Sequence, residues 1–150
     1  MLKVNDFRAY IEEIKNSVAE ITVAKTVMDD TQLAKILEAQ TSDTYIVLGI
    51  IPKHKFKGND YNLESNDITS ILILKKVVRS NQDHEIFLDV INEAQTVAQK
   101  VVNKLIADYE DDSNCHFIRK LIPNSFDINP IWGLNSCDGY EIDFSLTTDV

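Results

Sequence analysis

Apolar residues spaced three and four positions apart predict two long amphipathic helices, one near the start of the chain and one past its middle. In residues 7–21 and again in residues 84–109, this spacing places the apolar side chains on one helical face. Asn5 or Asp6 can cap the first helix, because their side-chain oxygens can accept the free amide protons of its first turn. A third, shorter helix is predicted over residues 32–40.

Four other segments have patterns typical of strands. Residues 44–51 form an apolar, β-branched run that predicts a central strand buried on both faces, with residues 68–78 as its partner. Residues 114–122 and 139–147 alternate apolar and polar residues, as half-buried strands do. The β-branched cluster at residues 22–26 is expected to be the frayed end of the first helix.

The predicted element order is therefore α-α-β-β-α-β-β. A chain of 150 residues fits one domain, so residues 1–150 are expected to form a single α+β domain. In this fold an antiparallel sheet packs against the long helix. Residues 52–66 separate the two central strands by too much for a tight turn, and they are expected to form a long polar loop.

Charge and cysteine content narrow the classes of function. The formal net charge of −9 argues against general nucleic-acid binding and against docking on anionic lipid. The start of the chain lacks the apolar region of a secretion signal, and no apolar run approaches the roughly 20 residues that span a bilayer. Two cysteines, Cys115 and Cys137, are too few for a disulfide scaffold, so we expect reduced thiols in a cytosolic setting.

No catalytic or cofactor-binding motif is present in the sequence. The four glycines stand apart and cannot build a phosphate-binding loop, and there is no Gly-x-Ser-x-Gly motif. Adjacent Cys115 and His116 would point to opposite faces of a strand, which disfavours a shared metal ion. We expect no enzymatic activity, no cofactor and no metal site.

Two segments of opposite charge form the candidate interaction site. The loop predicted over residues 52–66 carries a basic group around one aromatic ring, a local reversal of sign in an acidic chain. The end of the long helix is acidic, which opposes the helix macrodipole by up to about 1 kcal/mol. The alternative interpretation is that both segments are merely exposed to solvent and contact no partner. Trp132, the single tryptophan, is expected either at an interface or in the core. The candidate subunit-interface residues are Lys53, Lys55, Phe56, Lys57, Asp108, Glu110, Asp111 and Asp112.

The second half of the chain resembles small proteins encoded among the morphogenesis genes of tailed bacteriophages and prophages. The resemblance covers residues 68–147 and is carried by HEIFLDVINEAQ at 84–95, FIRKLIPNSFDINPIW at 117–132 and LNSCDGYEIDFSL at 134–146. The predicted element order is also similar to that of phage tail terminator and tail-completion proteins. This resemblance implies rings, usually hexameric, that close the head-proximal end of a tail. The long segment 52–66 differs from many of those proteins.

We therefore expect a structural virion protein that forms a ring at the tail or the head–tail junction. It would be assembled in the bacterial host cytoplasm with other tail or neck proteins, and it would bind neither membrane nor a specific nucleic-acid sequence. A ring needs a head-to-tail contact that closes on itself, and the basic segment meeting the acidic helix end of a neighbour would provide one. Two alternatives stay open: a small acidic inhibitor of the immunity type that neutralises a basic partner, and an enzyme whose site the sequence does not reveal.

Overall fold

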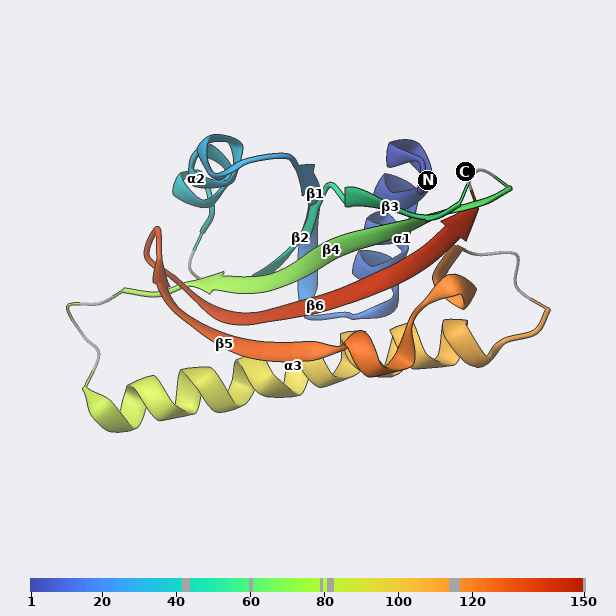
Figure 1. The fold of residues 1–150 in the computed structure, drawn as a ribbon. Coiled ribbons are helices and arrows are strands. Elements are labelled where there is room, and N and C mark those ends of the chain that lie inside the picture. Colours follow the sequence, from blue (N-terminus) through green and yellow to red (C-terminus); the bar gives the residue numbers. More distant parts are fainter. Residues whose placement is uncertain (42–43, 60, 79, 81–82, 114–116, 150) are drawn as a thin grey trace.

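In the residues that the computed structural model describes, the chain forms three α-helices, two short 3-10 helices and a six-stranded sheet (Figure 1). The structure describes residues 1–41, 44–59, 61–78, 80, 83–113 and 117–149. The elements are α1 (Val4–Ser17), β1 (Ile21–Val27), α2 (Asp30–Glu38), β2 (Tyr45–Ile50), β3 (Lys53–Asn59), β4 (Asn62–Lys76), α3 (His84–Glu110), the short 3-10 helices η2 (Phe117–Lys120) and η3 (Pro123–Ser125), β5 (Asp127–Leu134) and β6 (Cys137–Asp149).

The sheet has the strand order β1-β2-β4-β6-β5, and β3 pairs with β4 on the same side as β2. Strands β1 and β2 are parallel, whereas the other pairs are antiparallel. Strand β4 is the longest and organises the sheet, since its C-terminal half pairs with β2 and its N-terminal half with β3. Strand β6 runs beside β4 from Glu64 to Lys76.

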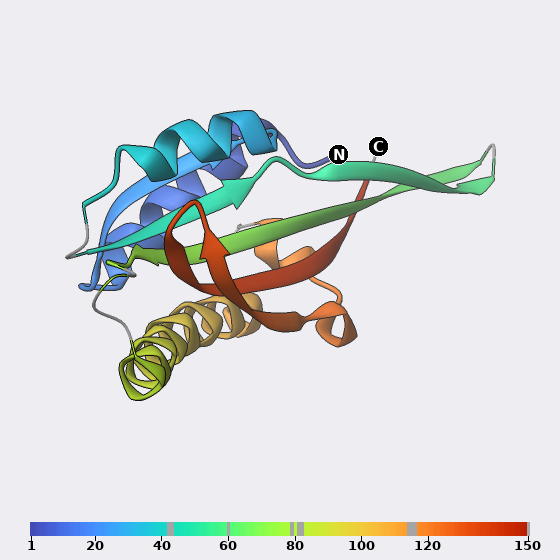
Figure 2. The same ribbon diagram turned by 90° about the vertical axis from the view of Figure 1, so that its left-hand side faces the viewer.

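Helices cover both faces of the sheet, with α3 below it and α2 above it in Figure 2. The main core joins α1 and α3 to one face, where Phe7, Ile11 and Ile14 of α1 are buried at the spacing that the sequence predicts. On the other face, Leu33 and Leu37 of α2 pack against β2 and β4. Strand β2 is therefore buried on both faces, as predicted.

The α+β class and the packing of a sheet against the long helix are confirmed. Helix α3 begins after Asp83, whose side chain accepts a hydrogen bond from the Ile86 amide at 2.9 Å. Helix α2 is capped in the same way by Asp29. The element order, however, is α-β-α-β-β-β-α-β-β with two 3-10 turns, which differs from the predicted α-α-β-β-α-β-β.

Four local predictions were wrong. Neither Asn5 nor Asp6 caps the first helix, because both lie within α1 and its N-cap residue, Lys3, makes no side-chain capping hydrogen bond. Residues 22–26 belong to β1, because their β-branched side chains fit a strand that pairs in parallel with β2. The expected loop at 52–66 is a β-hairpin made of β3 and the first part of β4. In the strand predicted over 114–122, residues 114–116 lie outside the described residues, residues 117–120 form a 3-10 helix, and Leu121 alone bridges to β6.

Candidate interaction surfaces

The β3–β4 hairpin projects from the body of the protein as an arm, which we define as residues 53–59 and 61–63 (Figure 2). It extends past the end of β6, so the side chains from Lys55 to Leu63 that the structure describes are exposed. The arm ends in apolar groups, with Tyr61 99% exposed, Phe56 53% and Leu63 49%. Exposed apolar side chains gathered on a projection are typical of a contact surface.

The three lysines predicted as interface residues share one face of the arm. Lys53, Lys55 and Lys57 alternate along β3 with His54 and Phe56, and successive side chains of a strand point to opposite faces. Within the described parts of the chain, none of the three lysines forms an ion pair. The arm therefore presents a stripe of three lysines beside its apolar end, with Glu64 opposite Lys57 in the pairing of β3 with β4.

Local backbone chemistry closes the arm. The Asn59 side-chain oxygen accepts hydrogen bonds from the amides of Tyr61 and Asn62, both at 3.1 Å. Gly58 has a φ of 121°, and a Cβ at this position would lie 1.9 Å from the Asn62 carbonyl oxygen. Only glycine fits there, so Gly58 and Asn59 fix where β3 ends and β4 begins.

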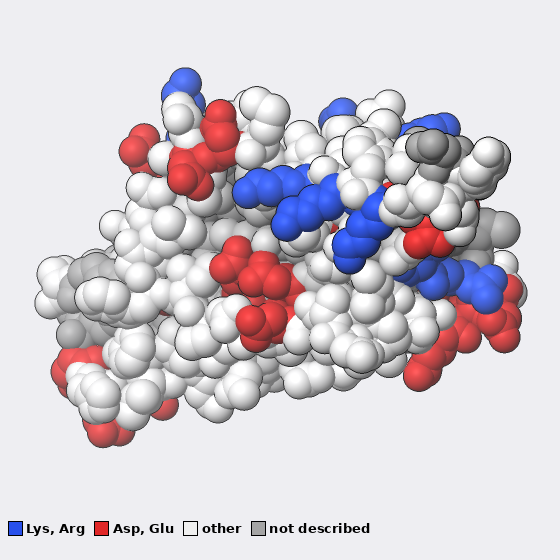
Figure 3. Space-filling view, viewed as in Figure 1, with Lys and Arg blue, Asp and Glu red and all other residues white. Residues whose placement is uncertain are grey.

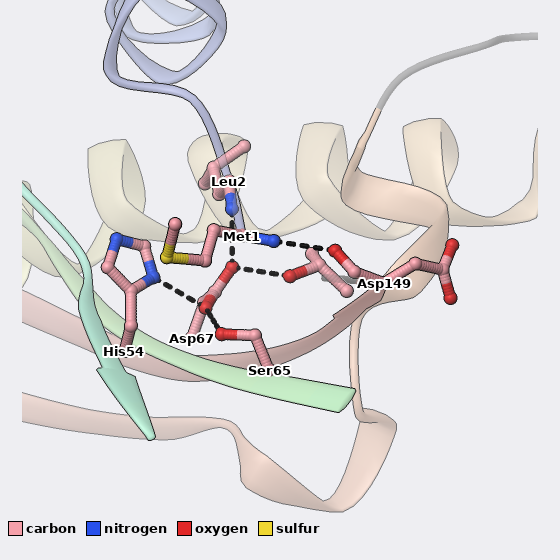
Figure 4. A network of polar contacts seen from close by, with 7 residues as sticks. Met1, Leu2, His54, Ser65, Asp67 and Asp149 are labelled. Carbon is pink, nitrogen blue, oxygen red and sulfur yellow. Dashed lines mark hydrogen bonds and ion pairs between the residues drawn. The ribbon is translucent and has the colours of Figure 1, made fainter. Parts of the chain in front are cut away.

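A buried carboxylate anchors the base of the arm (Figure 4). Asp67 on β4 is fully buried. Its Oδ1 accepts from His54 Nδ1 at 2.6 Å and from Ser65 Oγ at 2.5 Å, and its Oδ2 accepts from the Leu2 amide at 2.6 Å and Thr148 Oγ1 at 2.8 Å. These donors come from β3, β4, β6 and the segment before α1, so one side chain joins four parts of the fold.

The hydrogen bonds decide the ionisation of Asp67. Burial by itself would raise the pKa of this carboxyl group, but the hydrogen bonds from His54, Ser65, Thr148 and Leu2 outweigh burial and lower the pKa to about 2. Ser65 donates to the carboxylate and not to the imidazole, which is not the order that activates a serine nucleophile. The arrangement therefore serves to hold β3 against β4 and β6.

The acidic end of α3 is partly neutralised within the chain. Asp108 accepts from the Tyr10 hydroxyl at 2.7 Å and from Lys104 Nζ at 2.8 Å. Burial, together with the hydrogen bond to Asp108, raises the pKa of Tyr10. Asp112 pairs with Arg119 at 2.7 Å. Figure 3 shows the result at the lower right, where α3 ends: acidic and basic side chains lie next to one another.

The other two acidic candidates, Asp111 and Glu110, lie side by side at the end of the helix. Asp111 is the C-cap residue that follows α3. It accepts from the Ser113 hydroxyl at 2.6 Å and the Ser113 amide at 2.9 Å, and these hydrogen bonds lower its pKa. Glu110 is exposed. The structure thus keeps the basic and acidic candidates apart within one chain, on β3 and at the end of α3, and a contact between them would have to join two copies.

Sequence reasoning missed the anchor at Asp67 and left the position of Trp132 open. Trp132 lies on β5 and is 68% exposed, beside the start of α3. Cys137 is buried at the start of β6, and Cys115 lies outside the described residues. Alternation of lysines in residues 53–57 was the one available signal for β3, but both faces of that segment are polar or exposed.

No family model matches the chain, and no curated protein matches it in sequence. Among the described residues, no group of three or more His, Cys, Asp or Glu side chains is arranged to hold a metal ion. The helices that the structure describes also include none with the length and apolar character needed to cross a membrane. The surfaces described above are therefore the basis for a functional proposal.

Proposed function

We propose that this protein is a structural virion protein of a tailed bacteriophage or prophage, and that it forms a ring at the tail or the head–tail junction. The observation that carries the proposal is the arm, which exposes Phe56, Tyr61 and Leu63 on a projection anchored by a buried carboxylate. The phage context rests on the resemblance of residues 68–147 to morphogenesis proteins of tailed phages. The likeness to tail terminator proteins comes from the predicted element order, which differs from the order in the structure.

Physical chemistry favours a subunit contact as the role of the arm. Solvent-exposed apolar groups gain free energy when a partner covers them, at about 25 cal/mol per Å² of apolar surface. The anchor at Asp67 holds the base of the arm in one orientation, which limits the entropy lost when the arm binds. A contact between the arm and a different surface of a neighbouring copy would be head-to-tail, and such contacts close into a ring where the rotation between subunits allows it.

The oligomeric state tests the ring. The purified full chain is examined by native mass spectrometry and negative-stain imaging over a range of concentrations, alone and with assembled tails. We expect ring-shaped oligomers of one size. A matched variant that replaces residues 58–63 with a two-residue Asn-Gly turn leaves the pairing of Lys57 with Glu64 in register. It should keep its circular dichroism spectrum and remain monomeric, because this turn type closes hairpins well.

Other outcomes contradict the proposal. A chain that remains monomeric at every concentration, both alone and with tails, does not form a ring. Capture of one basic protein at 1:1 stoichiometry would instead favour the inhibitor alternative. The phage context is tested by mass spectrometry of purified particles from an induced host, where we expect this chain together with portal and tail proteins. Its absence from the particles would contradict a role in the virion.

A further inference from the structure

The start of α3 forms a second exposed apolar surface. The buried residues of α3 begin only at Ala94, although residues 84–93 contain several apolar side chains. Ile86 and Leu88 are exposed there. Figure 1 shows the reason: α3 begins beyond the β5–β6 turn, where the sheet no longer lies over it.

A groove runs between this part of α3 and β5. Its volume is about 300 Å³, and it is lined by Asp83, His84, Phe87 and Trp132. This volume lies at the lower end of the range for ligand pockets and accommodates an aromatic side chain. Tryptophan and phenylalanine are enriched where proteins meet, and Trp132 is one wall of the groove. We call residues 83–93 together with Trp132 the α3 surface.

The α3 surface is acidic where the arm is basic. Every charged residue between positions 83 and 99 is an acid: Asp83, Glu85, Asp89 and Glu93. Glu93 is paired with Lys75 at 3.2 Å, whereas Glu85 and Asp89 form no ion pair with the residues that the structure describes. Unpaired charges of opposite sign on two surfaces steer association and fix the register of the contact.

The arm and the α3 surface lie at opposite corners of the molecule. The end of the arm is at the upper right and the start of α3 at the lower left in both Figure 1 and Figure 2, which are views at right angles. A chain cannot bring its own arm to its own α3 surface. Contact between two such different surfaces is heterologous, and repetition around an axis gives a ring.

We propose that the arm of one copy docks on the α3 surface of the next copy. The Tyr61 ring enters the groove beside Trp132, and Lys55 and Lys57 pair with Glu85 and Asp89. This inference rests on the proposed ring and names the two surfaces that would form it. It assigns the acceptor role to the start of α3 instead of its end, where Asp108 and Asp112 already have partners within the chain.

A charge exchange tests the pairing. Lys55→Glu places an acid on the arm, and Glu85→Lys places a base on the α3 surface. Each variant alone should associate with itself about tenfold or more weakly than the unmodified chain, measured by sedimentation velocity. An equimolar mixture of the two should recover assembly, because every arm then meets a surface of opposite charge. The chain carrying both changes should recover it as well.

Glu110→Lys is the matched control, since it makes the same change at an exposed position on the other end of the same helix. We expect its self-association to stay within about twofold of the unmodified chain. A photo-reactive phenylalanine analogue at position 61 gives an independent measurement: mass spectrometry should find its cross-link in residues 83–93 or at Trp132 of another copy.

The outcomes separate this inference from the proposed function. Assembly that is weakened by Glu110→Lys and not by Glu85→Lys would overturn the α3 surface as the acceptor while leaving the ring intact. Failure of the mixed variants to assemble, when the unmodified chain does, would overturn it too. An unmodified chain that never associates would overturn both. A cross-link from position 61 to residues 108–112 of a neighbour would return the acceptor role to the acidic end of α3.

Discussion

Replacing Asp67 by asparagine should destabilise the protein and remove part of its pH dependence. The carboxylate accepts from His54 and Ser65 at one oxygen and from Leu2 and Thr148 at the other. Asparagine retains one acceptor oxygen, and its amide group would face two groups that donate to the carboxylate. The Leu2 amide cannot accept a hydrogen bond, whereas the hydroxyls of Ser65 and Thr148 and the His54 ring can accept one only after they reorient or change tautomer. The substitution therefore removes the charge and forces these buried groups to rearrange or to lose a hydrogen bond.

The magnitude follows from the change in proton affinity. The pKa of Asp67 falls from its ordinary 3.8 to about 2 on folding. Since each tenfold change in proton affinity corresponds to about 1.4 kcal/mol, ionised Asp67 stabilises the folded state by about 2 to 3 kcal/mol at neutral pH. Because the folded pKa is the lower one, this contribution is complete above about pH 5. About half of it should be lost by pH 3 and most by pH 2.

Urea unfolding of the unmodified chain and of Asp67→Asn, each at pH 7, pH 4 and pH 3, measures both effects. We expect Asp67→Asn to lose at least about 2 kcal/mol at pH 7, with the gap between the two proteins narrowing by about 1 kcal/mol at pH 3. Glu64→Gln, at an exposed position of the same strand, should change stability by less than about 0.5 kcal/mol. A gap that does not narrow in acid would refute the assignment of the low pKa to Asp67.

Three further changes probe the core and the surface. Gly49→Ala should cost about 1 to 3 kcal/mol in urea unfolding, because its Cβ would lie 2.6 Å from Ile11 Cγ1 and would push α1 off the sheet. Tyr10→Phe should cost about 1 to 2 kcal/mol by removing the hydroxyl that donates to Asp108, and an unchanged midpoint would contradict that contact. Trp132, the single tryptophan, should be quenched readily by acrylamide in the monomer, and its emission should shift to shorter wavelength on assembly.

The elements that the sequence predicted correctly are those whose packing matches a simple period. Helix α3 follows an apolar stripe through Val97, Val101 and Leu105, all of which are buried. Strand β6 alternates because Ile142, Phe144 and Leu146 face the core while their neighbours are less buried. In each element one face is more buried than the other, so the period of apolar and polar residues in the sequence predicts whether the segment is a helix or a strand.

The hairpin and the turn after α3 lack such a period. Strand β3 has no face in the core, so its residues show no apolar alternation, and it becomes a strand only because β4 offers a partner edge. Residues 117–122 do alternate, but Ile118 turns into the core as part of a 3-10 helix and Pro123 begins another. Pairing partners and tertiary packing decide these segments, and neither can be read from local sequence.

The anchor at Asp67 could not have been predicted for a related reason. Its donors come from residues 2, 54, 65 and 148, which the fold alone brings together. In the sequence, Asp67 is one of 24 acidic residues in an acidic chain, and solvation was the natural expectation. The lysines could be proposed as candidates because charge reversal is visible in the sequence, whereas the arm that presents them depends on the hairpin.

One part of strand β4 stabilises the fold, and another part is exposed and available for contact with other subunits. Its C-terminal part, from Ile71 to Leu74, is buried between the two helical layers, whereas Asn62 and Leu63 at its N-terminal end are exposed on the arm. Asp67 lies between these parts and ties the strand to β3 and β6. Substitutions beyond this anchor remove no core contact, so loss of assembly in an arm variant with unchanged unfolding would report on the interface itself. By contrast, Asp67→Asn would loosen the base of the arm, so it should weaken both assembly and the stability of the fold.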